Sequence, residues 1–236
     1  MLFELDERED ITLFEHKDVK AYVRAGTSDS FVVKEVFGGE YNKLNIKEGD
    51  VIADIGLNIG MFTCWAMLKG ASKVWSYEPD YENFQLATRN VELNGFTDKC
   101  KLHNDAVIGN DDEARKFSVN LKKNKGAHSL VAKRGRVTST VTCKNFNRII
   151  EELQPNVIKM DIEGGELEVL RNLKPGVLSG VREFIMEFHH AHLNDIGKEV
   201  LFKEVIGIMQ DNFKTVKYRE NPKGAWVSNI YCSSEE

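Results

Sequence analysis

The chain has 236 residues, of which 42% are hydrophobic and 29% charged, the composition of a globular protein with one sizeable core. Its formal net charge of −5 disfavours nucleic acid as the main partner, because proteins that bind nucleic acid usually carry a basic surplus. The sequence contains no apolar run of about 18 residues that predicts membrane insertion, and its four scattered cysteines form no Cys-x-x-Cys pair that would indicate a zinc knuckle or a disulfide framework.

Two small elements are predicted ahead of the core. Residues 10–24 alternate loosely between apolar and polar side chains, as a short β-hairpin does. A brief helix over residues 31–37 follows, with Ser30 in position to cap it. We therefore expect an N-terminal hairpin and cover helix over residues 1–40 and one larger domain over residues 41–236.

The N-terminal residues and the cysteines bear on the cellular location. Residues 1–6 are mostly acidic and apolar, whereas a signal peptide begins with basic residues. Cysteines without a disulfide pattern are typical of a reducing compartment. We expect a cytoplasmic protein.

The core begins at residues 51–60, where an apolar run ends in an acid and a turn opens with two glycines four residues apart. A Cβ at Gly56 or Gly60 would keep the backbone away from a ligand. Asn58 stands where a dinucleotide-binding turn has its second glycine, so a pyrophosphate fits poorly. A smaller ligand with a cationic centre, such as S-adenosylmethionine, fits better beside Asp54.

The next strand is predicted over residues 73–77 and is followed by Glu78, which lies 24 residues after Asp54. An acid at the end of the second strand of such a sheet can accept hydrogen bonds from both hydroxyls of a ribose. The alternative is an ordinary surface acid before a proline. A helix over residues 80–94, with Phe84 on its apolar face, comes next.

A third short strand is predicted over residues 101–103, and its end is where an adenine would lie. The candidate contacts there are Asn104, Asp105 and Ala106. Asp105 would accept a hydrogen bond from the adenine amino group, unless the Asn-Asp pair only forms a turn.

The alternation of helices and strands is interrupted once and then resumes. Two β-like segments, 115–119 and 136–143, flank a basic stretch over 122–136 that is either a solvated hairpin tip or a loop near the acceptor. The later predictions are helices over 146–153, 166–172 and 198–211 and strands over 157–160, 181–188, 213–218 and 226–231.

Helices between successive strands predict right-handed crossovers and a parallel sheet covered on both faces. The short loop between the last two strands makes them an antiparallel pair. The predicted fold class is therefore α/β, a Rossmann-like and mostly parallel seven-stranded sheet with a terminal antiparallel hairpin and helices on both faces. This is the pattern of class I methyltransferases.

Four motifs lie at the predicted strand ends: Asp54-x-Gly56-x-Asn58-Ile59-Gly60, Glu78-Pro79, Lys159-x-Asp161-x-Glu163-Gly164-x-Glu166 and Glu187-x-His189. In this combination they resemble the FkbM family of S-adenosylmethionine-dependent methyltransferases, over roughly residues 31–189. The resemblance implies S-adenosyl-L-methionine as cofactor and O-methylation, often of a sugar hydroxyl, as the reaction. Gly126 and Ser129 match further family positions. Asn145 stands where the family often has an aspartate, so either the acceptor differs or the residue only caps a helix.

Methyl transfer from a sulfonium needs alignment of donor and acceptor, and an alcohol acceptor also needs a base. The candidates at the ends of the fourth and fifth strands are Asp161, Glu163, Glu187 and His189. Asp161 should be nearest the methyl group, as base, as acceptor ligand or as partner of the methionine amino group. Glu163 would otherwise cap the next helix, His189 titrates near neutrality, and Glu187 would orient His189 or bind a sugar hydroxyl.

Two further readings concern the same side chains. Lys159 lies on the same strand face as Asp161, either as a buried ion-pair partner or as part of a Lys-Asp-Glu set like that of RNA 2′-O-methylation. Asp161, Glu187 and His189 are ligand types that suit a divalent ion, but their spacing does not demand one, so no metal is expected.

The predicted function is methyl transfer from S-adenosyl-L-methionine to a hydroxyl of a sugar, glycan or other small molecule. The alternative is an RNA methyltransferase. A nicotinamide-dependent oxidoreductase is disfavoured by Asn58, and a non-catalytic nucleotide-binding module would bind the cofactor without turning over an acceptor.

Overall fold

A computed structural model describes residues 11–119, 137–189, 198–219 and 227–235. The predictions for residues 1–6 and for the basic stretch over 122–136, with Gly126 and Ser129, lie outside the described residues. Among the residues that are described, no helix is both long and apolar enough to cross a bilayer.

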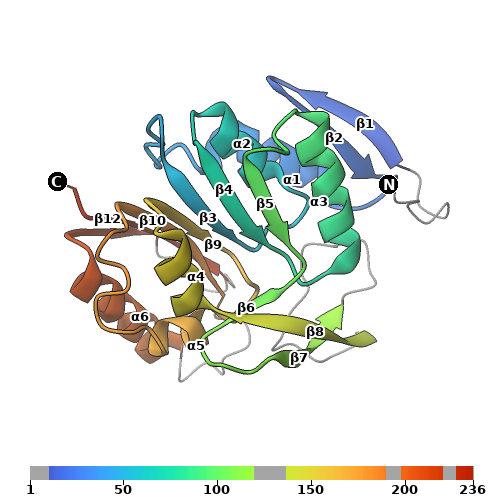
Figure 1. The fold of residues 1–236 in the computed structure, drawn as a ribbon. Helices are drawn as coiled ribbons and strands as arrows, with labels where there is room; N and C mark the ends of the chain where they lie inside the picture. Colours follow the sequence, from blue (N-terminus) through green and yellow to red (C-terminus); the bar gives the residue numbers. More distant parts are fainter. Residues whose placement is uncertain (1–10, 120–136, 190–197, 220–226, 236) are drawn as a thin grey trace.

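The centre of the molecule is a seven-stranded sheet in the order β11-β12-β10-β9-β3-β4-β5 (Figure 1). The bounds are β3 Val51–Ile55, β4 Lys73–Tyr77, β5 Cys100–His103, β9 Val157–Met160, β10 Glu183–His189, β11 Thr215–Tyr218 and β12 Val227–Ser233. The five strands from β10 to β5 pair in parallel, and β12 pairs antiparallel with both β10 and β11. The predicted sheet, including its antiparallel terminal pair, is confirmed.

Helices cover both faces of the sheet, as expected (Figure 1). One face carries α1 Asp29–Glu35, α2 Met61–Leu68 and α3 Tyr81–Leu93, and the other carries α4 Phe146–Leu153, α5 Glu166–Arg171 and α6 Lys198–Asn212. Each face has its own hydrophobic cluster: Val33, Trp65 and Leu86 belong to the first, and Phe146 and Val205 to the second.

Helix α4 buries the apolar face that the spacing of its hydrophobic residues predicts. Its predicted apolar face, Phe146, Ile149, Ile150 and Leu153, is buried in full. Asn145 caps the helix, because its side-chain oxygen accepts hydrogen bonds from the backbone amides of Asn147 at 2.8 Å and Arg148 at 3.4 Å. The departure from the family aspartate thus has a structural explanation.

Helix α3 is rotated slightly from the predicted orientation. Phe84 is only half-buried, whereas Asn83 and Asn90 are buried with Leu86 and Val91. The two asparagines face inward because they bond the N-terminal hairpin: Asn83 accepts from the Arg24 side chain at 2.7 Å, and Asn90 accepts from the backbone of the same strand at 2.6 Å.

The N-terminal hairpin is confirmed as β1 Ile11–His16 and β2 Val19–Arg24, but the helix after it differs from the prediction. Its N-cap is Ser28 and not Ser30, because the buried Asp29 must pair with the Arg24 side chain. The helical conformation also extends past residue 37, where the predicted helix ends. It continues into a π-helical turn, η1 Val36–Glu40, which Gly39 permits with a φ of +119°.

These N-terminal elements share one hydrophobic cluster with helix α2. A domain boundary near residue 40 therefore stays a prediction. The π-helical turn has a direct consequence for the site, since it brings Glu40 and Tyr41 to the carboxyl edge of the sheet.

The predicted β excursion forms a separate three-stranded sheet in the order β6-β8-β7. Its strands are β6 Ala106–Ile108, β7 Ala114–Val119 and β8 Val137–Asn145, with β6 parallel and β7 antiparallel to β8. Arg115 ties it to helix α5 through a bidentate pair with Glu168 at 2.6 and 2.8 Å.

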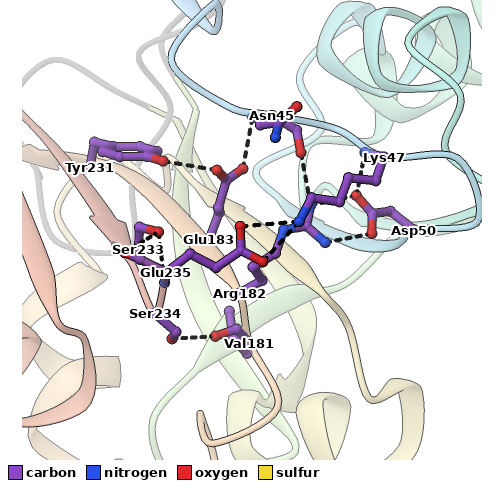
Figure 2. Close-up of polar contacts among 10 residues, drawn as sticks. All are labelled: Asn45, Lys47, Asp50, Val181, Arg182, Glu183, Tyr231, Ser233, Ser234 and Glu235. Atoms are coloured by element: carbon purple, nitrogen blue, oxygen red, sulfur yellow. Dashed lines mark hydrogen bonds and ion pairs between the residues drawn. The ribbon is translucent and has the colours of Figure 1, made fainter.

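A polar network fastens the opposite edge of the main sheet, where β3 and β10 begin (Figure 2). The Arg182 guanidinium donates to both carboxylate oxygens of Asp50, at 2.8 and 2.6 Å, and to the backbone oxygen of Asn45 at 2.8 Å. Glu183, 4% exposed, accepts from the hydroxyl of Tyr231 at 2.8 Å. The network joins the entry to β3 with β10 and β12.

We expect Arg182→Ala to destabilise the protein by about 3 kcal/mol, because it leaves the 5% exposed Asp50 without its ionic partner. Burial raises the pKa of Asp50, but the hydrogen bonds from Arg182 and the Lys47 amide outweigh it and lower that pKa overall. Urea unfolding measures the loss. The matched control is Arg171→Ala, which breaks an equally short pair with Glu204 at the exposed surface and should cost about 0–1 kcal/mol. Equal losses would contradict the role of burial.

Candidate functional site

The glycine turn after β3 has the backbone that its sequence predicts. Gly56, Asn58 and Gly60 have φ values of +96°, +52° and +87°. A Cβ on Gly56 would lie 1.8 Å from the backbone oxygen of Asp161. This glycine is therefore required first by the neighbouring strand end, and not only by a ligand.

Glu78 ends β4 and is 6% exposed. Its two oxygens accept backbone hydrogen bonds from Asn58 at 2.8 Å and from Asp80 at 2.9 Å. Burial raises the pKa of this carboxyl to about 8 against the lowering effect of those bonds. Each oxygen keeps a second acceptor position, which suits a pair of ribose hydroxyls.

A first cavity lies along the carboxyl edge between the main sheet and β6–β7. Among the predicted cofactor residues, Gly56, Asn58, Glu78 and Ala106 line it. Its apolar walls are Tyr77, Val107 and Phe117, which sequence reasoning missed. Phe117 sits on β7, and no local pattern in the sequence indicated that β7 returns to this edge. Apolar walls beside a buried carboxylate suit an adenosine.

Four predicted cofactor residues stay outside the lining of this cavity. Asp54 is fully buried beneath the turn, where it accepts from the Thr63 hydroxyl at 2.7 Å and lies 3.4 Å from the Lys159 Nζ. Burial raises its pKa in spite of Lys159. Gly60 is the N-cap of α2, and a Cβ there would meet the Cα of Ala87 at 3.2 Å.

The other two are Asn104 and Asp105. The Asn104 amide donates to the backbone oxygens of Glu78 at 2.8 Å and Pro79 at 3.3 Å, so it fixes the end of β4. Asp105 accepts from the Thr142 hydroxyl at 2.5 Å, which holds β8 beside it. Both positions were predicted from their place at a strand end, and their side chains bond the protein instead.

We expect Glu78→Ala to weaken S-adenosyl-L-methionine binding about 100-fold, because two hydrogen bonds to the ribose contribute about 1–1.5 kcal/mol each. Titration calorimetry measures the affinity. Glu92→Ala, an exposed acid on α3, is the control and should bind as the unmodified protein does. Unchanged affinity in the Glu78 variant would reject this cavity as the cofactor site.

A second cavity lies between the N-terminal cover (α1 with η1) and the same sheet edge. Asp161 and Glu163 line both cavities, whereas Glu187 lines only the second. Glu35 and Glu40 contribute two more carboxylates. Tyr41 is 5% exposed and packs edge-on against Phe62, and it also lines this cavity.

His189 ends β10 and is 9% exposed. Its Nδ1 lies 3.0 Å from Glu166 Oε1, and its Nε2 lies 3.5 Å from Glu163 Oε2 and 3.9 Å from Asp161 Oδ1. Burial lowers the pKa of His189, but the bond to Glu166 and the surrounding carboxylates raise it to about 10. At neutral pH the ring is therefore an imidazolium, which differs from the near-neutral titration expected from the sequence.

Glu166 is the site residue that the sequence did not single out. It is fully buried and accepts from the backbone amides of Ile162 at 3.1 Å and Gly164 at 3.0 Å. Glu166, and not Glu163, is therefore the carboxylate that bonds the glycine turn over residues 162–165. Glu163 itself has a φ of +55° and directs its carboxylate toward His189. The only signal was that Glu166 belongs to the same motif.

Lys159 and Glu187 complete the site. Lys159 Nζ donates to the Gly56 backbone oxygen at 2.5 Å and lies 3.9 Å from Asp161 Oδ2, so the predicted buried ion pairing is confirmed. Burial, the charge of Asp161 and a hydrogen bond with Glu40 raise the pKa of Glu187 to about 9.

Comparisons with known proteins agree with this geometry. The family model of the methyltransferase FkbM domain matches residues 54–217. The hexuronic acid methyltransferase AglP of Haloferax volcanii is 29% identical over 143 residues, which cover 61% of this chain and 57% of that protein, less than two thirds of its length. Methyltransferase sdnD of Sordaria araneosa is 25% identical over 213 residues, covering 74% of this chain and 80% of that protein.

Among solved structures, the tRNA m1G37 methyltransferase of M. jannaschii superposes with a TM-score of 0.50 at 12% identity and covers 97% of this chain and 58% of that one. A sequence identity of 12% supports a shared fold and no shared function. It agrees with the class I methyltransferase sheet expected from the order of elements.

Proposed function

The chain belongs to the FkbM methyltransferase family, and from this premise we propose that it transfers the methyl group of S-adenosyl-L-methionine to a hydroxyl of a sugar, glycan or other small molecule. The first cavity would hold the donor, with Glu78 on its ribose. The second cavity would hold the acceptor.

One observation carries the proposal: Asp161 and Glu163 line both cavities. A methyl group that passes from a donor in one cavity to an acceptor in the other must pass close to these two carboxylates. A cationic sulfonium is also favoured beside them, because opposite charges attract strongly where water is scarce.

The reaction needs few steps from the protein. The acceptor oxygen attacks the methyl carbon, the carbon–sulfur bond breaks with its electron pair left on sulfur, and the hydroxyl proton leaves for a base. We assign the base to a carboxylate at the junction, and alignment of the acceptor to the catalytic set Asp161, Glu163, Glu187 and His189. His189, held by Glu166, would hold the carboxylates in place and would not accept the proton.

The charge of the second cavity supports a neutral acceptor. Glu35, Glu40 and Glu187 line it together with the two carboxylates at the junction, and among the described residues of the lining Lys159 is the one cation. These carboxylates would repel an RNA phosphate. They would also repel a hexuronate, the kind of compound for which AglP is named. Lys159 beside Asp161 is the feature that keeps RNA 2′-O-methylation as the alternative.

A screen with labelled methyl donor tests the proposal. Neutral sugars and glycans, hexuronates and tRNA are compared side by side at one ionic strength. We expect label in a neutral hydroxyl-bearing acceptor and little in hexuronate or tRNA. Salt-sensitive labelling of tRNA alone would support the alternative and overturn the proposal.

A further inference from the structure

The ends of β9 and β10 carry a ligand set that methyl transfer alone does not require. Asp161, Glu187 and His189 each offer one ligand atom, and these atoms lie within 4.8 Å of one another. Two ligands of one ion are about 3–5 Å apart when each metal–ligand bond measures about 2.0–2.6 Å. The three side chains can therefore share one cation after small side-chain rotations.

The fold places these ligands together for a simple reason. Strands β9 and β10 are parallel neighbours whose last paired residues are Met160 and Met186, so Asp161, just after β9, lies beside Glu187, where β10 continues along β12. Glu187 and His189 are two residues apart on one strand and point to the same face. Each ligand thus comes from a rigid part of the sheet edge.

His189 is oriented as metal-binding imidazoles are. Its Nδ1 is bonded to the fully buried Glu166, which is itself fixed by two backbone amides. The other ring nitrogen faces Asp161 Oδ1 and Glu163 Oε2. A carboxylate behind the histidine is the usual outer partner of a metal ligand.

The charge around the set also calls for a cation. Lys159 lies on the far side of Asp161, next to Oδ2, and is shared with Asp54 and the Gly56 backbone oxygen. The Oδ1 oxygen of Asp161 and the carboxyl group of Glu187 remain on the cavity side. A divalent ion would displace the proton from His189 Nε2, which then gives its lone pair to the metal, and would take over the positive charge beside these carboxylates.

We propose that Asp161, Glu187 and His189 bind one divalent transition-metal ion, with Mn²⁺ as the best-suited ion, whose open positions face the second cavity. One imidazole and two carboxylates form a mixed ligand set that Mn²⁺ accepts readily. The role of the ion in catalysis rests on the proposed function: hydroxyl oxygens of the acceptor would occupy the open coordination positions. Coordination makes a hydroxyl more acidic, so that Glu163 can take its proton as the oxygen attacks the methyl group. The expectation of no metal is thereby revised.

Direct Mn²⁺ binding to the full chain tests the site. Protein stripped with EDTA is titrated with Mn²⁺, and free Mn²⁺ is followed by electron paramagnetic resonance. We expect one ion per chain, and affinity reduced at least about 10-fold in Asp161→Asn, Glu187→Gln and His189→Gln. Glu204→Gln, which changes a carboxylate on the outer face of α6, is the control and should bind as before. Circular dichroism confirms that each variant is folded.

The outcomes separate this inference from the proposed function. No stoichiometric binding, or equal binding in all three ligand variants, overturns the metal site, and methyl transfer that persists in EDTA would then leave the proposed function standing. Stoichiometric Mn²⁺ binding that the ligand variants lose supports the site even if no hydroxyl acceptor is methylated.

Discussion

Alanine in place of Gly56 is expected to abolish S-adenosyl-L-methionine binding and to lower stability by more than about 3 kcal/mol. Two effects add. The φ of +96° is strained for any residue with a side chain, and the new Cβ would lie 1.8 Å from the Asp161 backbone oxygen. Since the obstacle is backbone, β3 and β9 must separate, which also breaks the bond from Lys159 to the Gly56 oxygen.

Thermal unfolding and calorimetry with the cofactor measure this result, and the expected fall in Tm is about 6–12 °C for a chain of this size. Gly95→Ala is the matched control. Gly95 has a φ of +75°, and nothing lies within 4 Å of the Cβ that alanine would add. That variant carries the backbone strain alone, about 1 kcal/mol, and keeps cofactor affinity. Equal losses in both variants would show that contact with Asp161 plays no part.

The Asp161→Asn variant is expected to keep S-adenosyl-L-methionine affinity within a few-fold while turnover falls about 10²–10⁴-fold. Asparagine preserves the size of the side chain, and the backbone amide of residue 161 still donates to Ile55 O at 2.8 Å, so the strand end keeps its shape. The variant loses the negative charge at the junction of the two cavities, and with it a candidate proton acceptor and one of the three proposed metal ligands.

Single-turnover rates with labelled donor, together with calorimetry, separate binding from chemistry in this variant. Asp98→Asn, an exposed acid after α3, serves as control and should keep full activity. Full activity of the Asp161 variant would remove this residue from the mechanism. Loss of cofactor affinity instead would assign Asp161 to the methionine amino group, a role that its sequence position also allowed.

The carboxylates that line the proposed acceptor cavity bear on the comparison with the relatives. AglP is named for a hexuronic acid, yet Glu35, Glu40 and Glu187 line the cavity that we propose for the acceptor. The carboxylates in this cavity repel one another: burial and the charges of Glu40 and Asp161 raise the pKa of Glu35 to about 6.

The sequence by itself determined the sheet and most of its helices, and it predicted the edge at which the site should lie. Local patterns sufficed for this, since an apolar stripe such as that of α4 or a glycine turn such as residues 56–60 depends mostly on neighbouring residues. Asp161, Glu163, Glu187 and His189 could be placed at one edge because parallel strands all end on the same side.

Only the tertiary structure decided what each of these side chains touches. Residues 40, 161 and 187 are far apart in the chain, and nothing local predicts that a π-helical turn sets Glu40 against Glu187 or that Glu166 turns His189 into a buried cation. The same packing moves Asp54 beneath the turn and out of the cavity lining. Burial and charge act between groups brought together by the fold, so their effects on pKa and on ligand choice arise only once water has been excluded from the assembled edge.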